Sequence, residues 1–135
     1  MKYLIKNGTL VNEGKIEQKD ILIDGNAISR IDRDITDENA AVLDAAGKYI
    51  LPGIIDDQVH FREPGLTHKA SIYSESSAAV AGGVTSFMEQ PNTKPAALTQ
   101  ELLEEKYQIA AQTSLANYTF FMGTSNDNYD EVMKT

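Results

Sequence analysis

The chain has 135 residues, 41% hydrophobic and 24% charged, a composition typical of a globular domain with an ordinary core. Its formal net charge of −8 argues against nucleic acid or an anionic membrane as a partner, since both are bound through basic patches. The absence of cysteine excludes disulfides, cysteine-based zinc sites and thiol nucleophiles, and it fits a cytoplasmic protein. The polar start excludes a secretory signal, and no apolar run is long enough for a transmembrane helix.

Residues 1–51 predict a small β domain. Short alternating or apolar runs between Gly, Asn and Asp turn signals predict strands at 2–11 (interrupted by a turn at Asn7-Gly8), 21–23, 27–31, 42–44 and 48–51. The strongest hairpin signal is Asp24-Gly25-Asn26. The charged segment 32–39 is interpreted as a solvated loop. We expect such a unit to bury one face against partner strands from elsewhere.

From residue 52 the pattern changes to alternating strands and helices, which is typical of βαβ units. The predicted order is strand 54–60, helix 71–81, strand 84–89, helix 100–113, strand 117–122 and a helix that starts at 129. Ser71 and Thr99 are the expected N-caps, and Gly82-Gly83 ends the first helix. The apolar residues of the second helix are expected to pack on the sheet, namely Leu102, Leu103, Tyr107, Ile109 and Ala110.

The most distinctive segment is Asp56-Asp57-Gln58-Val59-His60-Phe61-Arg62-Glu63-Pro64-Gly65, at the end of the first of these strands. Strand alternation would place Asp56, Gln58 and His60 on one face. Polar groups at the carboxyl end of a strand in a βα protein are typical of the rim of an active site. The residues alone leave open a structural or solvated His60.

Extended back to Pro52, this segment closely resembles the signature of dihydroorotases, which are zinc-dependent members of the amidohydrolase superfamily. Residues 81–93, which end in Pro91-Asn92-Thr93, are similar to the second barrel strand of that family and the loop after it. The order and spacing of the two blocks agree. Arg62 and the Pro-Asn-Thr loop favour dihydroorotases over hydantoinase-like and allantoinase-like relatives.

The resemblance implies an α/β fold, the start of a (β/α)8 barrel, with 52–135 as its first three βα units and 1–51 as part of a small β-sandwich. A closed barrel needs roughly 200 to 250 residues. We therefore expect the N-terminal portion of a longer polypeptide, inactive by itself, with the general base and further ligands beyond Thr135. The implied activity is the reversible hydrolysis of the cyclic amide of dihydroorotate to N-carbamoyl-aspartate in pyrimidine biosynthesis.

The resemblance also assigns roles to individual residues. His60 matches a zinc ligand, and Arg62 and Asn92 match the residues that grip the substrate carboxylate. A guanidinium presents a planar fork that fits a carboxylate, and in an acidic protein such a local cation is needed to attract an anion. Taken singly, Arg62 reads as a solvated arginine and Asn92 as a turn residue after proline.

One position departs from the family pattern. Gln58 stands where the first histidine of a His-x-His pair is expected, and a carboxamide is a poorer zinc ligand than an imidazole. We expect one or two zinc ions, with Gln58 a doubtful ligand. His68 is interpreted as a structural loop residue, and Glu89 as an acid without catalytic consequence.

Two alternatives stay open. The first is a catalytically inactive homologue that serves as a structural partner of another pyrimidine enzyme. The second is a small-molecule binding module without hydrolysis. The expected partners are a small-molecule substrate and either identical copies, in a homo-oligomer, or the remainder of the same polypeptide.

Overall fold

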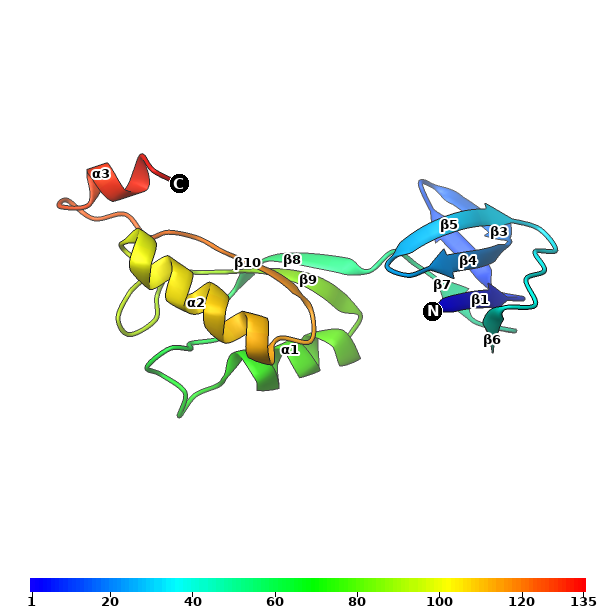
Figure 1. Cartoon of the computed structure of the whole chain (residues 1–135), viewed down its shortest axis with the longest axis horizontal. Coiled ribbons are helices and arrows are strands. Elements are labelled where there is room, and N and C mark those ends of the chain that lie inside the picture. Colours follow the sequence, from blue (N-terminus) through cyan, green and yellow to red (C-terminus); the bar gives the residue numbers. More distant parts are fainter. The chain divides into compact units, whose positions relative to one another are not determined.

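A computed structural model describes all residues, 1–135, and the chain divides into two compact units, Met1–Pro52 and Gly53–Thr135. The first unit contains only strands, and the second alternates strands with helices (Figure 1). No helix is both long and apolar enough to cross a bilayer.

The first unit consists of two small sheets. The four-stranded sheet has the order β5-β4-β1-β6, with β1 at Lys2–Lys6, β4 at Asp20–Asp24, β5 at Ala27–Asp32 and β6 at Ala40–Asp44. The three-stranded sheet has the order β3-β2-β7, with β2 at Thr9–Asn12, β3 at Lys15–Gln18 and β7 at Tyr49–Ile50. The hairpin predicted at Asp24-Gly25-Asn26 is confirmed, since β4 and β5 pair in antiparallel fashion.

The turn predicted at Asn7-Gly8 carries the chain from one sheet to the other. Asn7 takes a positive φ of 64°, and a Cβ on Gly8 would lie 2.2 Å from Ile50 Cδ1, so a side chain there would have to displace that of Ile50. The strand β3 was not predicted from the sequence. Its signal is the Glu13-Gly14 pair, whose φ angles of 49° and 72° form the tight turn between β2 and β3.

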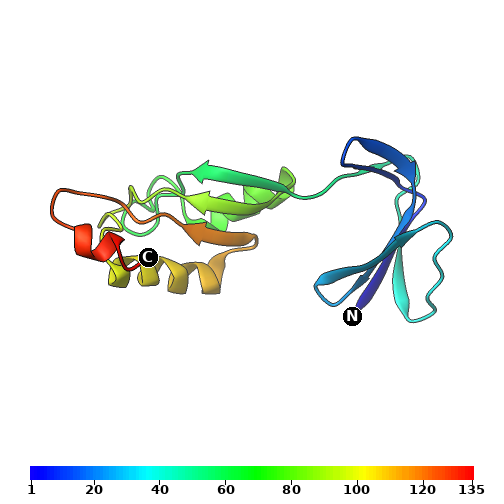
Figure 2. The ribbon, with the colours of Figure 1, turned by 90° about the horizontal axis from the view of Figure 1, so that it is seen from above.

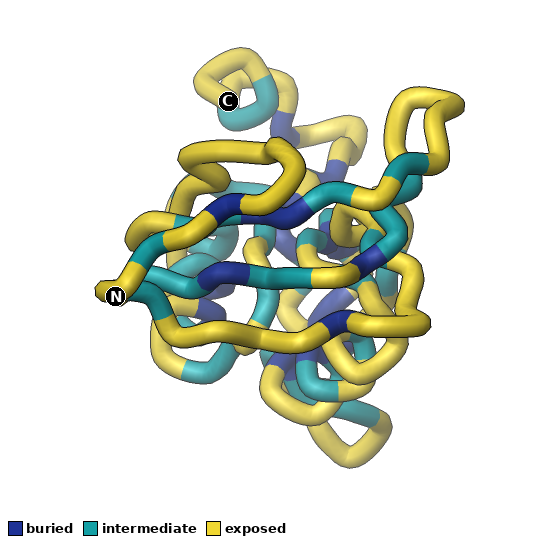
Figure 3. Tube along the Cα trace, turned by 90° about the vertical axis from the view of Figure 1, so that its right-hand side faces the viewer, coloured by how far each residue is buried: buried dark blue, intermediate teal, exposed yellow.

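The interpretation of 32–39 as a solvated loop is wrong at one position. Ile35 is 1% exposed and forms the core of this unit with Leu4, Ile21 and Ala45. The backbone N–H of Ile35 donates to Asp20 Oδ2 at 3.0 Å, which ties the loop to β4. Buried positions along the trace are short stretches between exposed ones (Figure 3).

The second unit is a parallel sheet of three strands with the order β10-β9-β8, seen side by side in Figure 2. Its elements are β8 at Ile54–Val59, α1 at Ile72–Ala81, β9 at Val84–Glu89, α2 at Gln100–Thr113, β10 at Asn117–Phe120 and α3 at Tyr129–Val132. All six were predicted. Three of them end earlier than expected. β8 ends at Val59 and not at His60, β10 ends at Phe120 and not at Met122, and α3 ends at Val132 and not at Thr135.

Both predicted N-caps are confirmed. The side chain of Ser71 accepts the backbone N–H of Ser74 at 3.1 Å, and that of Thr99 accepts the N–H of Leu102 at 3.2 Å. Gly83, with φ at 90°, turns the chain out of α1 into β9. Aromatic residues dominate the core, which consists of Phe61, Ile72, Phe87, Ala110 and Phe120. Leu103, Tyr107 and Ile109 pack against it, as the sequence predicted.

Candidate active site

The carboxyl ends of two neighbouring parallel strands bring the predicted site residues together. Val59, the last residue of β8, pairs with Glu89, the last residue of β9, and the N–H of Gln90 donates to the Val59 carbonyl at 3.0 Å. His60 directly follows β8, and Asn92 follows β9 by three residues. The chain segments that leave the two strands therefore start side by side.

His60 and Asn92 are in contact through their side chains. Nδ1 of the His60 ring lies 3.0 Å from Asn92 Oδ1, and both residues are exposed. Because an amide oxygen only accepts, Nδ1 carries the proton of this bond, and a neutral ring then has its lone pair on Nε2. A second bond that fixes the tautomer in this way is the usual arrangement of a metal-binding histidine.

Arg62 lies in the same group. Its backbone has φ at 73°, a left-handed conformation that is costly for a residue with a side chain. Its N–H donates to Glu89 Oε1 at 3.0 Å, its carbonyl accepts the N–H of Leu66 at 3.1 Å, and Nη1 lies 3.5 Å from the Asn92 carbonyl. The imidazole of His60 and the guanidinium of Arg62 thus both contact Asn92.

The expected alternation along β8 is wrong near its end. The pairing of β8 with β9 shifts between Ile54 and Ile55 and again between Asp56 and Val59, where three steps on β8 match two on β9. Such a bulge breaks the two-residue period, so Asp56, Gln58 and His60 do not follow one regular face. Gln58 is exposed, and its side chain makes no hydrogen bond to His60, Arg62 or Asn92.

The residues of this chain do not by themselves fit a zinc ion. A protein zinc site uses three or four protein ligands, and no group of three His, Cys, Asp or Glu side chains lies close enough to hold a metal. His60 is one imidazole with a free Nε2, and Gln58 offers only a neutral oxygen. His68 is exposed in the loop before α1 and belongs to no such group.

A buried ion pair lies next to Arg62, whose N–H bonds to one of its members, Glu89. Lys106 Nζ, on α2, is 2.9 Å from Glu89 Oε2, and both side chains have no exposed surface. The ion pair with Lys106 is the compensation for the buried charge on Oε2, which has no other polar partner. Lys106 Nζ donates to the Gln90 carbonyl at 3.1 Å and lies 4.8 Å from the centre of the Phe120 ring. Burial lowers the pKa of Lys106, and the Glu89 carboxylate opposes that shift.

The ion pair between Glu89 and Lys106 was not predicted from the sequence, although a signal for it exists. Leu103, Lys106 and Ala110 follow each other at three and four residues, so Lys106 lies on the apolar stripe of α2. A lysine on such a stripe that is buried needs an acidic partner, and Glu89 ends β9, which lies next to β10, the strand on which α2 packs.

The loops that carry Arg62 and Asn92 are also tied to each other. The N–H of Lys94 donates to the Pro64 carbonyl at 3.1 Å. Gly65 has φ at 79°, and a Cβ there would lie 1.8 Å from the Lys94 carbonyl oxygen. Gly65 therefore allows a backbone-to-backbone approach that no other residue permits.

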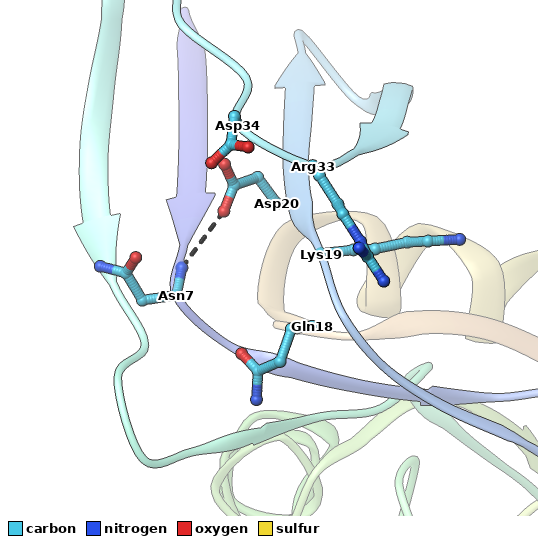
Figure 4. Close-up of a pocket in the computed structure, with 6 residues that line it drawn as sticks. All are labelled: Asn7, Gln18, Lys19, Asp20, Arg33 and Asp34. Atoms are coloured by element: carbon cyan, nitrogen blue, oxygen red, sulfur yellow. Dashed lines mark hydrogen bonds between the residues drawn. The ribbon is translucent and has the colours of Figure 1, made fainter.

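The first unit has a polar hollow of about 330 Å³ lined by Asn7, Gln18, Lys19, Asp20, Arg33 and Asp34. Asp20 accepts the backbone N–H of Asn7 at 3.2 Å, and the side chains of Lys19 and Arg33 extend away from it (Figure 4). Its carboxylate also accepts the Ile35 N–H and lies 3.5 Å from Lys6 Nζ. The buried acid of this hollow is thus engaged in holding the chain, and the hollow is not a candidate for chemistry.

Comparison with solved structures defines the class of protein. The chain is similar to an L-hydantoinase (dihydropyrimidinase) from Arthrobacter aurescens, with a TM-score of 0.92 and 30% identity, over 98% of this chain and 30% of that one. The fold is that of part of a cyclic amidohydrolase.

Sequence comparison gives the family. A model described as dihydro-orotase-like matches residues 47–131. The dihydroorotase of Lactococcus lactis subsp. lactis is 46% identical over 142 aligned positions, which cover 99% of this chain and 34% of that protein. The dihydroorotase of Carboxydothermus hydrogenoformans is 48% identical over 97 residues, 70% of this chain and 23% of that protein. The chain belongs to the dihydroorotase-like family, and it spans about a third or less of the length of these relatives.

Proposed function

We propose that the polypeptide to which this chain contributes is a dihydroorotase, which reversibly hydrolyses the cyclic amide of dihydroorotate to N-carbamoyl-aspartate in pyrimidine biosynthesis. The observation that carries the proposal is the meeting of His60, Arg62 and Asn92 at the carboxyl ends of β8 and β9, in a chain of the dihydroorotase-like family.

The contacts of Asn92 suit the binding of a carboxylate. Its Oδ1 is turned to His60, so its Nδ2 is left to donate to another acceptor. The guanidinium of Arg62 makes one long contact, to the Asn92 carbonyl, so most of its N–H groups are left for a ligand. A neutral amide and a cation on neighbouring loops match the carboxylate of dihydroorotate.

The proposal includes a (β/α)8 barrel and a zinc cofactor of one or two ions. β8 is an edge strand, and its Ile54 and Ile55 are 56% and 68% exposed, surfaces that further strands and helices of a barrel would bury. His60 is the one imidazole that these strand ends offer to zinc, with Gln58 as a weaker donor. Residues 1–135 alone are therefore expected to be inactive.

The test uses the full-length polypeptide. We expect bound zinc, measured by elemental analysis, and turnover of dihydroorotate that is lost on chelation and restored by zinc. Residues 1–135 expressed alone serve as the control without activity. Protein that binds dihydroorotate, seen by calorimetry, but carries no zinc and has no turnover would instead indicate a binding module. Protein that binds neither would indicate an inactive structural homologue.

A further inference from the structure

We propose that Glu89, neutralised and held by Lys106, is the residue that positions Arg62 for the substrate. This role rests on the proposed function, since it acts through the carboxylate-binding arginine. Glu89 is on the last position of β9, has no exposed surface, and contacts the backbone of residue 62 rather than its side chain.

The first step is the conformation of Arg62. A left-handed backbone is costly at a residue with a side chain, so it persists only where its surroundings hold it. The holding contacts are the N–H of Arg62 to Glu89 Oε1 at 3.0 Å and the N–H of Leu66 to the Arg62 carbonyl at 3.1 Å. Without the first, the residue is free to return to an ordinary φ, and its side chain would then leave Asn92.

The second step is the role of Lys106. It balances the buried charge of Glu89 at 2.9 Å and donates to the Gln90 carbonyl at 3.1 Å, two residues before Asn92. One lysine on α2 therefore links the ends of both strands, because Glu89 bonds to the loop after β8 and Gln90 starts the loop after β9.

A role in stability alone does not account for the buried pair of Glu89 and Lys106. Replacing a buried ion pair with apolar residues of similar volume is often neutral or stabilising, so stability alone gives little reason for this pair. What an apolar pair cannot supply is an acceptor for the N–H of Arg62. The contact with the backbone of Arg62 is thus the specific contribution of Glu89.

The experiment compares two double variants in the full-length enzyme. Glu89→Gln with Lys106→Met removes both charges but keeps an oxygen that accepts the Arg62 N–H. Glu89→Leu with Lys106→Met removes both charges and the acceptor. We expect the KM for dihydroorotate to stay close to wild type in the first and to rise roughly tenfold in the second, because a displaced binding group loses its contact. In the second variant kcat should change less than KM.

The same leucine variant made in an Arg62→Met protein distinguishes the positioning role of Glu89 from the proposed function. In an Arg62→Met protein, the leucine variant should raise KM no further, because both changes remove the same interaction. If Arg62→Met alone raises KM and the leucine variant does not, the positioning role is overturned and the proposed function survives. If Arg62→Met leaves KM unchanged, the carboxylate-binding role fails, and the positioning role fails with it.

A second variant is available if the leucine variant fails to fold. Glu89→Met with Lys106→Met removes the same acceptor with a more adaptable side chain. Hydrogen exchange in the wild-type enzyme is a further measure: the amide of Arg62 should exchange slowly, as a buried acceptor requires. Exchange at the rate of an open loop would overturn the positioning role.

Discussion

Replacement of Gly65 by alanine tests whether the two loops of the candidate site are held at a fixed spacing. Gly65 has φ at 79°, so alanine there costs about 1–2 kcal/mol from the backbone alone. The added Cβ would lie 1.8 Å from the Lys94 carbonyl oxygen, which is backbone and cannot rotate away. Overpacking of this kind costs typically 1–3 kcal/mol, so the total loss of unfolding free energy is about 2–5 kcal/mol.

Gly83→Ala provides a matched control in the same unit. Gly83 has φ at 90°, but nothing lies within 4 Å of the position of its Cβ, and it stands at the opposite end of β9 from the site. Urea denaturation of both variants of the full-length protein should therefore differ by the clash alone, about 1–3 kcal/mol. The KM for dihydroorotate should rise in Gly65→Ala and stay at the wild-type value in Gly83→Ala. Equal unfolding free energies and equal KM values in the two variants would refute the reasoning.

Three further changes have definite expected outcomes. Arg62→Met should weaken dihydroorotate binding by about 1.5–3 kcal/mol in calorimetry, since a charge-assisted hydrogen bond is lost, and unchanged affinity would remove Arg62 from the site. Ser71→Ala should lower the unfolding free energy by about 1 kcal/mol in urea titration through loss of the N-cap of α1, and an effect no larger than that of a surface alanine would contradict the cap. Hydrogen bonds from Asn7 and from the Ala46 N–H hold the pKa of Asp44 below its usual value, so its contribution is present above about pH 4 and is lost as the pH falls through the lowered pKa. Asp44→Asn should flatten that acid limb of the stability curve, and a curve of unchanged shape would show that Asp44 does not contribute to it.

Most of the second unit could be predicted from sequence because its signals are local. Ser71 and Thr99 cap helices through contacts three residues along the chain, and Gly83 supplies a backbone angle at the point where the helix must end. The family resemblance also selected His60, Arg62 and Asn92, and the structure brings these three together at adjacent strand ends. Their chemical roles stay predictions.

What could not be predicted depends on contacts distant in sequence. The backbone N–H of Arg62, a residue with a positive φ, bonds to Glu89, which is 27 residues away, and a contact at that separation has no local signal in the sequence. The bulge in β8 is a property of its pairing with β9, so strand alternation failed at Gln58. Ile35 read as solvated because charged residues surround it, whereas Asp20 binds its backbone and draws it into the core.

Asn92 faces two neighbours at once, the His60 ring through its side chain and the Arg62 guanidinium through its carbonyl. Truncating its side chain would remove the partner of the imidazole and the amide donor proposed for the ligand, but it would leave the carbonyl that Arg62 contacts. Kinetic losses in such a variant would therefore belong to positions 60 and 92 together. Because Asn92 contacts both neighbours, substitutions at positions 60, 62 and 92 should occur together in related enzymes. A redesign for a different cyclic substrate should therefore change these three positions as one set.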